Sequence, residues 1–377
     1  MSHSPLPQII KDHILSSPQQ KITFAEYMQL ALYHPDYGYY TNGQVHIGAK
    51  GDFFTSPHLG PDFGELLAIK FFQMWQNMGQ PPSFTLVEMG AGHGILAQDI
   101  LNYLSTHHLD FFSCLQYIII ETSPALIQRQ QETLTSFPVT WTSWDDIPDN
   151  SIIGCFFSNE LVDAFPVHQF VLEDGNIKEV YVTVNQNSTD RPEFIEVIDT
   201  VSTPKIIDYF DLVGIKFNHL YINGYRSEVN LAALNWLEIV SNKLQQGYLL
   251  TIDYGYDSHR YYNPQRYQGT LQCYYQHQHH SNPYINIGLQ DITAHVDFTS
   301  LQKQGQLCQL PTIEYTKQGL FLMELGLGDR LISISSNQSF SPQDIHVLLH
   351  QRDALHQLIN PTGLGGFAVL IQTKNYV

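Results

Sequence analysis

The stretch FTLVEMGAGHGI at residues 84–95 decides the fold of this chain. It is typical of a short apolar strand, a turn with glycine at Gly90, Gly92 and Gly94, and the start of an amphipathic helix. Glycine suits such a turn because the backbone needs positive φ angles and because a Cβ atom would block the approach of a ligand. A second apolar strand follows the helix at residues 117–121. The order strand, turn, helix, strand predicts a parallel βαβ unit.

The flanking sequence extends this unit into a larger sheet. Apolar runs at residues 152–160 and 247–254 are continuous, as expected for strands that are buried on both faces. Shorter strands are expected at residues 139–141 and 367–373, and an apolar helix at residues 63–78. We therefore predict an α/β fold of the Rossmann-like type with a mostly parallel central sheet, an N-terminal extension and an inserted α+β region.

The expected domain organisation follows the same pattern. Residues 1–80 form N-terminal helices and a long loop, residues 81–170 and 247–377 form the core, and residues 171–246 form an inserted region. The insertion begins with a hairpin whose turn is Glu173-Asp174-Gly175-Asn176.

The spacing of the glycine turn favours a nucleoside without phosphates over a dinucleotide. A dinucleotide-binding turn carries a third glycine at the position where this chain has Ile95. S-adenosylmethionine has no phosphate, so only its carboxylate needs to approach the start of the helix. The residues expected to form this part of the cofactor site are Glu88, Gly90, Ala91, Gly92 and Gly94. A tight turn with a purely structural role is the alternative.

Polar residues after the next two strands are expected to complete the cofactor site. Glu121 is placed to accept hydrogen bonds from both ribose hydroxyls, with Thr122 and Ser123 beside it. The alternative for Glu121 is a surface carboxylate that caps the following helix. Trp144 could flank the adenine ring while Asp145 accepts its amino group, although a surface loop often carries such residues without binding anything.

Carboxylates at the ends of two further core strands are candidates for methyl transfer. Asn159 is expected to adjoin the cofactor, and a helical turn would place Glu160 and Asp163 on one side, where they could hold a guanidinium. Glu160 could instead satisfy backbone amides at a helix start. Asp253 ends the next core strand, and His295 lies among carboxylates as a candidate general base or a partner of one. A histidine in such a place is more often a packing residue.

Charge and cysteine content narrow the partners and the compartment. The chain has 377 residues, with 18 Lys and Arg against 36 Asp and Glu, which gives a formal net charge of −18. This charge repels phosphate backbones and disfavours a nucleic acid partner, whereas a guanidinium-bearing partner is favoured. The four cysteines lack metal-binding or redox spacing, and no apolar run is long enough to span a membrane. We expect a soluble cytoplasmic protein without a metal, and the tract His277-Gln278-His279-His280 is expected in a polar loop.

Together these motifs resemble the MidA family of class I S-adenosylmethionine-dependent methyltransferases over nearly the whole chain. The resemblance rests on Ile22-Thr23-Phe24 with Tyr27-Met28, Ala31-Leu32-Tyr33, Pro35, Gly38-Tyr39-Tyr40, Gly51-Asp52-Phe53, Thr55-Ser56-Pro57, Phe63-Gly64, the glycine turn after Glu88, Asn159-Glu160-Leu161, Asp163-Ala164, Pro166-Val167, Asp253-Tyr254-Gly255, Gly269-Thr270-Leu271, Cys273-Tyr274, His277, residues 291–298 and Gln318-Gly319.

The resemblance implies a methyltransferase that acts on a protein arginine, since the family includes the mitochondrial complex I assembly factor with that activity. A protein subunit of a complex I-type assembly is then the expected partner. It also implies that the loop at residues 33–61 closes over the cofactor, which places Thr55, Ser56 and Pro57 in the cofactor site. Two departures stand out: the family usually has Pro and Arg where this chain has Ala91 and His93, and Glu where it has His58.

Two other functions stay open from the sequence alone. The chain could be a non-catalytic assembly protein that retains the fold, or a methyltransferase for a small molecule. Its oligomeric state is equally open, and a homodimer is compatible with the sequence.

Overall fold

The computed structural model describes residues 4–43, 55–187, 192–276, 278–336 and 342–375 of the chain. The chain divides into two compact units, which we call the core unit and the accessory unit. The core unit consists of Ile47–Leu161, Glu238–Tyr254 and Gly305–Val377. The accessory unit consists of Met1–His46, Val162–Leu237 and Gly255–Gln304.

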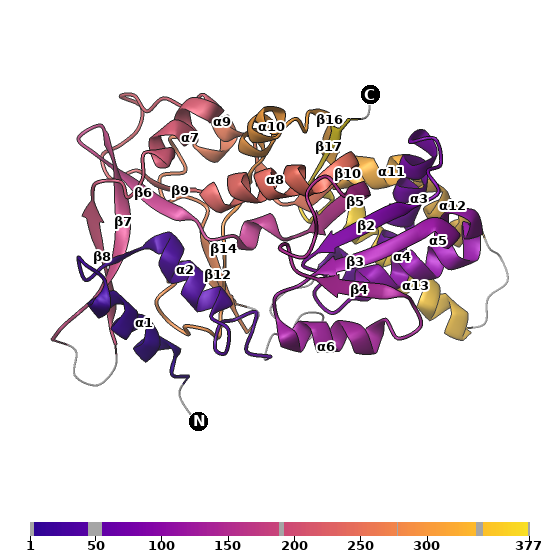
Figure 1. Ribbon diagram of the computed structural model, residues 1–377, viewed down its shortest axis with the longest axis horizontal. Coiled ribbons are helices and arrows are strands. Elements are labelled where there is room, and N and C mark those ends of the chain that lie inside the picture. The colour runs from indigo at the N-terminus through magenta and orange to yellow at the C-terminus, as the bar shows by residue number, and fades with distance from the viewer. Residues whose placement is uncertain (1–3, 44–54, 188–191, 277, 337–341, 376–377) are drawn as a thin grey trace. The chain divides into compact units, whose positions relative to one another are not determined.

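The core unit is built on a seven-stranded sheet in the order β16-β17-β10-β5-β2-β3-β4 (Figure 1). Its strands are β2 (Phe84–Met89), β3 (Leu115–Ile120), β4 (Val139–Thr142), β5 (Ile152–Asn159), β10 (Leu244–Asp253), β16 (Thr312–Lys317) and β17 (Ala368–Lys374). All neighbours from β4 to β10 are parallel, whereas β17 is antiparallel to β10 and to β16. The predicted α/β fold with a mostly parallel sheet is therefore confirmed.

The strand order also locates a ligand crevice. From β2 the chain continues to β3 on one side, and it later returns to β5 on the other side of β2. Ligands of open α/β sheets bind at the carboxyl ends of the strands where the order reverses in this way. In this unit, that point is the edge formed by the ends of β2, β3 and β5.

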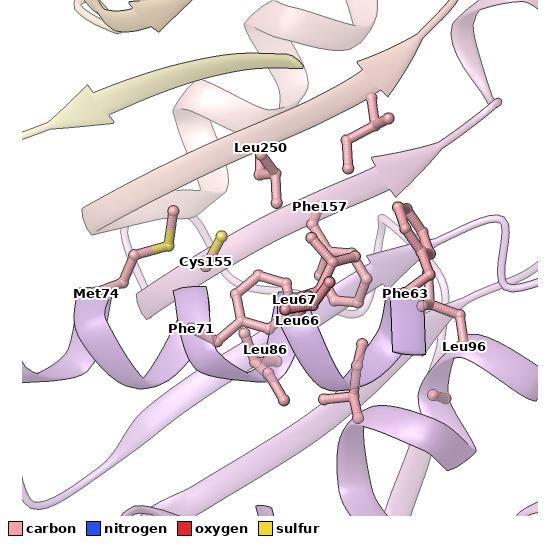
Figure 2. Packing of buried hydrophobic residues seen from close by; sticks show 14 of the residues in the cluster. Phe63, Leu66, Leu67, Phe71, Met74, Leu86, Leu96, Cys155, Phe157 and Leu250 are labelled. Carbon is pink, nitrogen blue, oxygen red and sulfur yellow. The ribbon is translucent and has the colours of Figure 1, made fainter. Parts of the chain in front are cut away.

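Helices of the core unit cover the sheet with apolar side chains. They are α3 (Asp62–Asn77), α4 (Ile95–His107), α5 (Leu109–Cys114), α6 (Pro124–Thr133), α11 (Gln318–Glu324), α12 (Leu327–Ser336) and α13 (Pro342–Ile359), with 3-10 turns η1 (Ser56–Leu59) and η3 (Leu364–Gly366). Figure 2 shows α3 packed on the sheet, with Phe71 against Phe157 of β5. These two rings have centroids 4.8 Å apart. The long apolar face of α3 thus anchors the strand that carries Asn159 at its end.

The accessory unit is rich in antiparallel strands and short helices. Its sheets contain β1 (Ile22–Thr23), β6 (His168–Glu173), β7 (Asn176–Val184), β8 (Phe194–Asp199), β9 (Arg226–Val229), then β11 (Gly255–Tyr256) with β15 (Val296–Asp297), and β12 (Gln272–Tyr275) with β13 (Gln278–His280) and β14 (Asp291–Thr293). Its helices are α1 (Leu6–Ser16), α2 (Phe24–Tyr33), η2 (Val162–Ala164), α7 (Lys205–Val213) and α9 (Ser258–Tyr261). Two helices, α8 (Leu231–Lys243) and α10 (Phe298–Leu307), contain a unit boundary.

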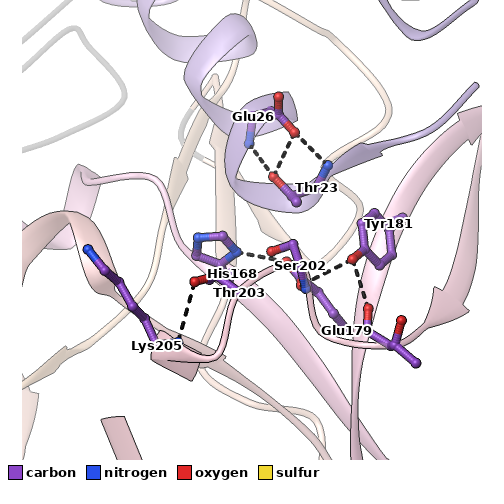
Figure 3. Close-up of polar contacts among 9 residues, drawn as sticks. Thr23, Glu26, His168, Glu179, Tyr181, Ser202, Thr203 and Lys205 are labelled. Carbon is purple, nitrogen blue, oxygen red and sulfur yellow. Dashed lines mark hydrogen bonds and ion pairs between the residues drawn. The ribbon is translucent and has the colours of Figure 1, made fainter. Parts of the chain in front are cut away.

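Local sequence rules explain two features of this unit. Thr23 and Glu26 form a capping box, in which Thr23 Oγ1 accepts from the Glu26 amide at 3.1 Å and Glu26 Oε2 accepts from the Thr23 amide at 3.0 Å (Figure 3). The hairpin between β6 and β7 turns through Asp174 and Gly175, whose φ angles of 51° and 77° match a two-residue hairpin turn with positive φ. The expected hairpin is therefore confirmed.

Glu179 is a buried carboxylate that ties together three segments of the accessory unit. Its Oε1 lies 2.7 Å from Nδ1 of His168, and its Oε2 accepts from the Ser202 amide at 2.5 Å (Figure 3). Burial alone would raise the pKa of Glu179, but the hydrogen bonds from His168 and Ser202 outweigh burial and lower it. The carboxylate therefore stays charged and holds β6, β7 and the segment before α7 together.

The units divide the chain differently from the boundaries expected from the sequence. Residues 255–304 and the N-terminal 46 residues lie together in the accessory unit. The sequence pattern placed residues 255–304 in the core and the N-terminal residues in a separate extension. The reason is that the chain leaves the sheet directly after β10, without the Gly- and Pro-rich stretch that usually marks a domain boundary.

Replacing Phe71 with Ala tests the packing of α3 on the sheet. Phe71 is fully buried, so its truncation should lower the free energy of unfolding by about 3–5 kcal/mol. Leu109→Ala is the control, since Leu109 is 65% exposed and its truncation should change little. Urea unfolding followed by circular dichroism measures both, and equal effects of the two variants would contradict this packing.

Candidate cofactor site

The glycine turn between β2 and α4 has the positive φ angles that the sequence predicts. Gly90, Gly92 and Gly94 have φ angles of 72°, 52° and 78°. The amide of Gly90 donates to the carbonyl of Ile120 at 3.1 Å, which fixes the turn to the end of β3. A Cβ atom at Gly90 would lie 2.9 Å from Cδ1 of Leu161. Positive φ and close approach together require glycine here.

The start of α4 presents backbone amides that no side chain of the described residues caps. Gly94 is the N-cap residue and has no side chain to cap the helix, and the first turn of α4 contains no acidic residue. The amides at the first turn of a helix have no partner within the helix, and the helix dipole places partial positive charge there. A carboxylate is therefore the group that this helix start can bind.

Glu88, the last acidic residue of β2, is buried beside the turn. Its Oε2 accepts a hydrogen bond from the hydroxyl of Tyr117 at 2.6 Å. Burial raises the pKa of Glu88 to about 7, the Tyr117 hydrogen bond lowers it, and the charge of Glu121 raises it further. Glu88 therefore titrates near neutral pH. Its contacts within the described residues stabilise the strands that carry the turn.

Glu121 lies directly after β3 and is held by hydrogen bonds on both carboxylate oxygens. Its Oε1 accepts from the amides of Thr122 and Ser123 at 2.9 and 3.0 Å, and its Oε2 accepts from Nε2 of Gln130 at 3.1 Å. Burial raises its pKa, and these hydrogen bonds oppose the increase. Glu121 does not cap α6, because the amides that it binds precede the helix, and the first-turn amide of Leu126 donates to the hydroxyl of Ser123 at 3.4 Å. The hydrogen bonds of Glu121 instead fix its own carboxylate in place.

Gln130 of α6 contacts two parts of the candidate cofactor site, and the sequence motifs do not reveal it. Besides Glu121, its Nε2 donates to the carbonyl of Gly92 at 2.9 Å, and its Oε1 accepts from Nε1 of Trp141 at 2.8 Å. The side chain is fully buried. Buried polar side chains need hydrogen-bond partners, and those of Gln130 come from three other segments of the chain. A motif search along the sequence therefore does not find them.

Trp144 and Asp145 lie after β4, as expected, but only partly support the predicted adenine contact. The Trp144 ring stacks on Phe156 of β5, with centroids 5.9 Å apart and an interplanar angle of 17°. Asp145 is exposed, and the neighbouring Asp146 accepts from the Ser143 hydroxyl at 2.6 Å. The indole is thus held in a fixed orientation at the sheet, while Asp145 stays open to solvent.

Asn159 and Glu160 occupy the carboxyl end of β5. Nδ2 of Asn159 donates to Oε1 of Glu160 at 3.2 Å, whereas Oδ1 of Asn159 is buried without a hydrogen-bond partner in the part of the chain that the structure describes. Glu160 has a φ angle of 51°, which is unusual for a residue other than glycine, and its amide donates to the carbonyl of Ile252 at 2.9 Å. Strained backbone and an unsatisfied buried acceptor are both typical of functional positions.

Asp253 ends the neighbouring strand β10 and is completely buried. Its Oδ1 accepts from the amide of Tyr254 at 2.8 Å. The candidate residues Asn159, Glu160 and Asp253 therefore lie at the carboxyl ends of two adjacent parallel strands, as the sequence predicts.

The segment at residues 55–59 contributes three further expected cofactor residues, Thr55, Ser56 and Pro57. Thr55 Oγ1 lies 2.8 Å from Nδ1 of His58, and the buried Ser56 hydroxyl accepts from Nε2 of Gln318 at 3.2 Å. Burial lowers the pKa of His58, and the charge of His93 lowers it further, so the two histidines that depart from the family pattern influence one another. Within the expected lid at residues 33–61, residues 44–54 lie outside the described residues.

Asp163 and His295, the remaining candidates, belong to the accessory unit. Asp163 lies in η2, is buried, and accepts from the amide of Ala294 through its backbone carbonyl at 2.9 Å. Burial, and then the charges of Arg266 and Arg260, lower the pKa of His295 to about 4. His295 is therefore neutral at physiological pH, which makes it a weak base.

Two kinds of feature are absent among the described residues: a side-chain group that could hold a metal ion and a helix that could cross a membrane. No group of three or more His, Cys, Asp or Glu side chains there is arranged to hold a metal ion. His277 lies outside the described residues, and His279 and His280 lie in β13 rather than in the loop that the sequence suggested. None of the described helices combines the length and the apolar character that crossing a membrane requires.

Comparison with known proteins identifies relatives over most of the chain. A family model described as "Putative S-adenosyl-L-methionine-dependent methyltransferase" matches residues 66–316. Protein arginine methyltransferase NDUFAF7 of Mus musculus, a mitochondrial protein, is 31% identical over 91% of this chain and 79% of its own length. Its mitochondrial homologue in Drosophila melanogaster is 28% identical over 96% of this chain and 83% of its own length.

A solved structure has the same fold throughout. A protein from Burkholderia thailandensis with bound S-adenosyl-homocysteine superimposes with a TM-score of 0.83 at 29% identity. The match covers 99% of this chain and 92% of that protein. Both units, and not only the sheet, therefore have a counterpart of known structure.

The names of these relatives correct one expectation. The sequence led us to expect a cytoplasmic protein, but the curated relatives are named as mitochondrial proteins. The cytoplasmic assignment is therefore wrong. It rested on cysteine usage and on the lack of a membrane-spanning apolar run, and neither distinguishes the cytoplasm from other reducing compartments.

Replacing Glu88 with Gln tests whether burial raises the pKa of the Glu88 carboxyl group. The folded protein binds a proton at Glu88 up to about pH 7, whereas the unfolded chain releases it near the ordinary value of 4.5. Stability should therefore fall as the pH rises through this window. The variant keeps an acceptor for Tyr117 but cannot ionise, so it should gain on the order of 3 kcal/mol relative to the wild type between about pH 5 and pH 8.

Urea midpoints at the two pH values measure this difference. Glu132→Gln, at an exposed position of α6, is the matched control and should follow the wild type. A wild-type stability that changes with pH in the same way as that of the Glu88 variant would contradict the raised pKa.

Proposed function

The chain belongs to a family of S-adenosyl-L-methionine-dependent methyltransferases, and on that premise we propose that it methylates an arginine side chain of another protein. The family membership agrees with the resemblance to the MidA family found in the sequence motifs. The observation that carries the arginine is the set of relatives named protein arginine methyltransferase, which align with more than nine-tenths of this chain. The alignment includes the accessory unit, which contains most of the inserted region at residues 171–246, and the family resemblance implies that this region binds substrate.

The cofactor fits the carboxyl ends of β2, β3 and β5. The first-turn amides of α4 can bind its carboxylate, and the bare backbone at Gly90 and Gly92 lets it approach. The buried Oδ1 of Asn159 lacks a hydrogen-bond donor within the described residues, and the cofactor's ammonium group can supply one. Gln130 and two backbone amides hold the Glu121 carboxylate, which keeps acceptor capacity for the ribose.

The remaining contacts of the cofactor are assigned from the sequence motifs. We assign Trp144 to the adenine ring and the exposed Asp145 to its amino group. Thr55, Ser56 and Pro57 are assigned to the loop that covers the cofactor, and the hydrogen bond between Ser56 and Gln318 fixes the start of this segment on the core unit.

Methyl transfer needs a guanidinium held in place with a lone pair available. The bound cofactor supplies a methyl group on a positively charged sulfur. Glu160 can accept hydrogen bonds from guanidinium N–H groups, and its backbone is fixed by the hydrogen bond to Ile252, so its side chain starts from a defined position. Asp163 and Asp253 are the further carboxylates that we propose to act on the substrate. His295 is neutral and can orient a partner more readily than it can store a proton.

The methylated protein is proposed to be a subunit of a complex I-type respiratory assembly. This part of the proposal rests on the family resemblance. The net charge of −18 supports a basic, arginine-bearing segment as the substrate, because opposite charge accelerates encounter.

Replacing Glu121 with Gln should weaken binding of S-adenosylmethionine by about 10- to 100-fold. The loss follows from weaker hydrogen bonds to the ribose once the acceptor is uncharged. Isothermal titration calorimetry measures the dissociation constant, with the exposed Glu132→Gln as control. An unchanged dissociation constant would remove Glu121 from the cofactor site, and no binding by the wild type would refute the enzymatic function.

Replacing Glu160 with Gln should reduce methyl transfer by at least about 100-fold while cofactor binding stays within about twofold of the wild type. The substrate source is an extract of cells that lack the gene, incubated with cofactor labelled in its methyl group. Acid hydrolysis then identifies the labelled amino acid, and Glu132→Gln again serves as control. Label on a residue other than arginine would refute the substrate class, whereas full activity of the Glu160 variant would refute only its role.

A further inference from the structure

Two arginines of the accessory unit differ from the other arginines that the structure describes. The others pair with carboxylates: Arg129 with Glu132, Arg226 with Glu196, Arg330 with Asp62 and Glu65, and Arg352 with Asp353. Arg260 and Arg266 have no carboxylate within 4.0 Å among the described residues. In a chain with twice as many acidic as basic residues, two such neighbours are unexpected.

Both guanidinium groups lie against one aromatic ring. The Cζ atoms of Arg260 and Arg266 are each 4.4 Å from the ring centroid of Tyr256. The ring of His295 meets Tyr256 edge-on, with centroids 5.0 Å apart. We call Tyr256, Arg260, Arg266 and His295 the Tyr256 site. Cation–π contacts of this kind orient a guanidinium without consuming its hydrogen-bond donors.

Most of those donors have no acceptor in the described part of the protein. Nη1 of Arg266 donates to the carbonyls of Arg260 and Tyr261 at 2.5 and 3.2 Å, and the Arg260 guanidinium makes no hydrogen bond there. Each guanidinium has five N–H donors. The Tyr256 site therefore presents two oriented cations with several unused donors, and Arg260 is exposed to solvent.

Carboxylates near this site in the sequence are occupied elsewhere. Asp257 caps α9 by accepting from the Arg260 amide at 3.1 Å. The buried Asp297 accepts from Ser258 and Tyr209, at 2.7 and 2.8 Å. His295 is neutral, so it adds no third positive charge. Among the residues that the structure describes, no carboxylate therefore pairs with the two positive charges of the site.

We propose that Arg260 and Arg266 bind a carboxylate side chain of the protein substrate, on an Asp or Glu near the arginine that is methylated. This inference rests on the proposed function. A carboxylate matches the planar fork of a guanidinium and can accept two hydrogen bonds from it. A nucleic acid is disfavoured because the net charge of −18 repels a polyanion, whereas a single carboxylate experiences mainly its neighbours within about 8 Å. The site would select a segment that carries both an acidic and a basic residue.

Fluorescently labelled peptides with one arginine and a single Glu, moved through each of the flanking positions in an otherwise neutral sequence, test the proposal. Binding is measured by anisotropy with S-adenosyl-homocysteine present, and each Glu peptide is compared with its Gln counterpart. At one position or more, the wild type should bind the Glu peptide about tenfold more tightly. Arg260→Gln should remove this preference, and Arg260→Glu should reverse it in favour of a Lys peptide.

Two further variants serve as controls. Arg352→Gln removes an exposed arginine of the core unit and should keep the preference for Glu. Arg266→Gln should also lose the preference, but it removes two hydrogen bonds to backbone carbonyls, so the result with Arg260, which makes none, is the decisive one.

The proposal is overturned if the wild type binds Glu and Gln peptides equally at every position, or if the preference survives in the Arg260→Gln variant. If the wild type binds a phosphoserine peptide much more tightly than the Glu peptide, and Arg260→Gln abolishes the difference, the ligand of the site is a phosphate and not a carboxylate. Methylation of the same peptides separates this inference from the proposed function: a Glu preference in binding without any methylarginine would refute arginine methylation and leave the anion site standing.

Discussion

The side chain of Gln130 makes the hydrogen bonds on which the arrangement of the candidate cofactor site depends. Its amide group contacts the Glu121 carboxylate after β3, the carbonyl of Gly92 in the glycine turn, and the indole of Trp141 in β4. One buried amide thus fixes the carboxylate, the turn and an edge strand with respect to one another. Preorganisation of this kind matters because a cofactor that finds its partners already in place loses less free energy to their ordering.

Much of the core unit could be predicted from the sequence because residues close together in the sequence determine its strands and turns. A continuous apolar strand followed by glycines at Gly90, Gly92 and Gly94 has few structural alternatives, and the polar residues that end β3, β5 and β10 follow from where parallel strands terminate. The contribution of Gln130 could not be predicted, since its role depends on three partners distant in the sequence. The pair Arg260 and Arg266 was missed for the same reason: only the fold brings both against Tyr256.

For the candidate catalytic residues, the sequence predicted the positions but not the charge states. The sequence placed Glu160 and Asp253 at strand ends, and the structure places them there. It suggested His295 as a general base, but it could not show that burial and two arginines keep this ring neutral. The charge state of a side chain depends on its surroundings in three dimensions, and no spacing rule encodes those surroundings. The unit boundaries were missed because no Gly- and Pro-rich stretch marks the point where the chain leaves β10.

The backbone conformation of Glu160 lowers the stability of the protein at a position whose side chain we assign to activity. A residue other than glycine at a φ angle of 51° costs about 1 kcal/mol or more, and a glycine there would avoid that cost. A laboratory selection for heat resistance would therefore tend to favour glycine at this position and discard the side chain that we assign to the substrate. In natural sequences, an acidic residue in this conformation is retained only by selection for activity. The residue at this position therefore separates active enzymes from relatives that have kept only the fold.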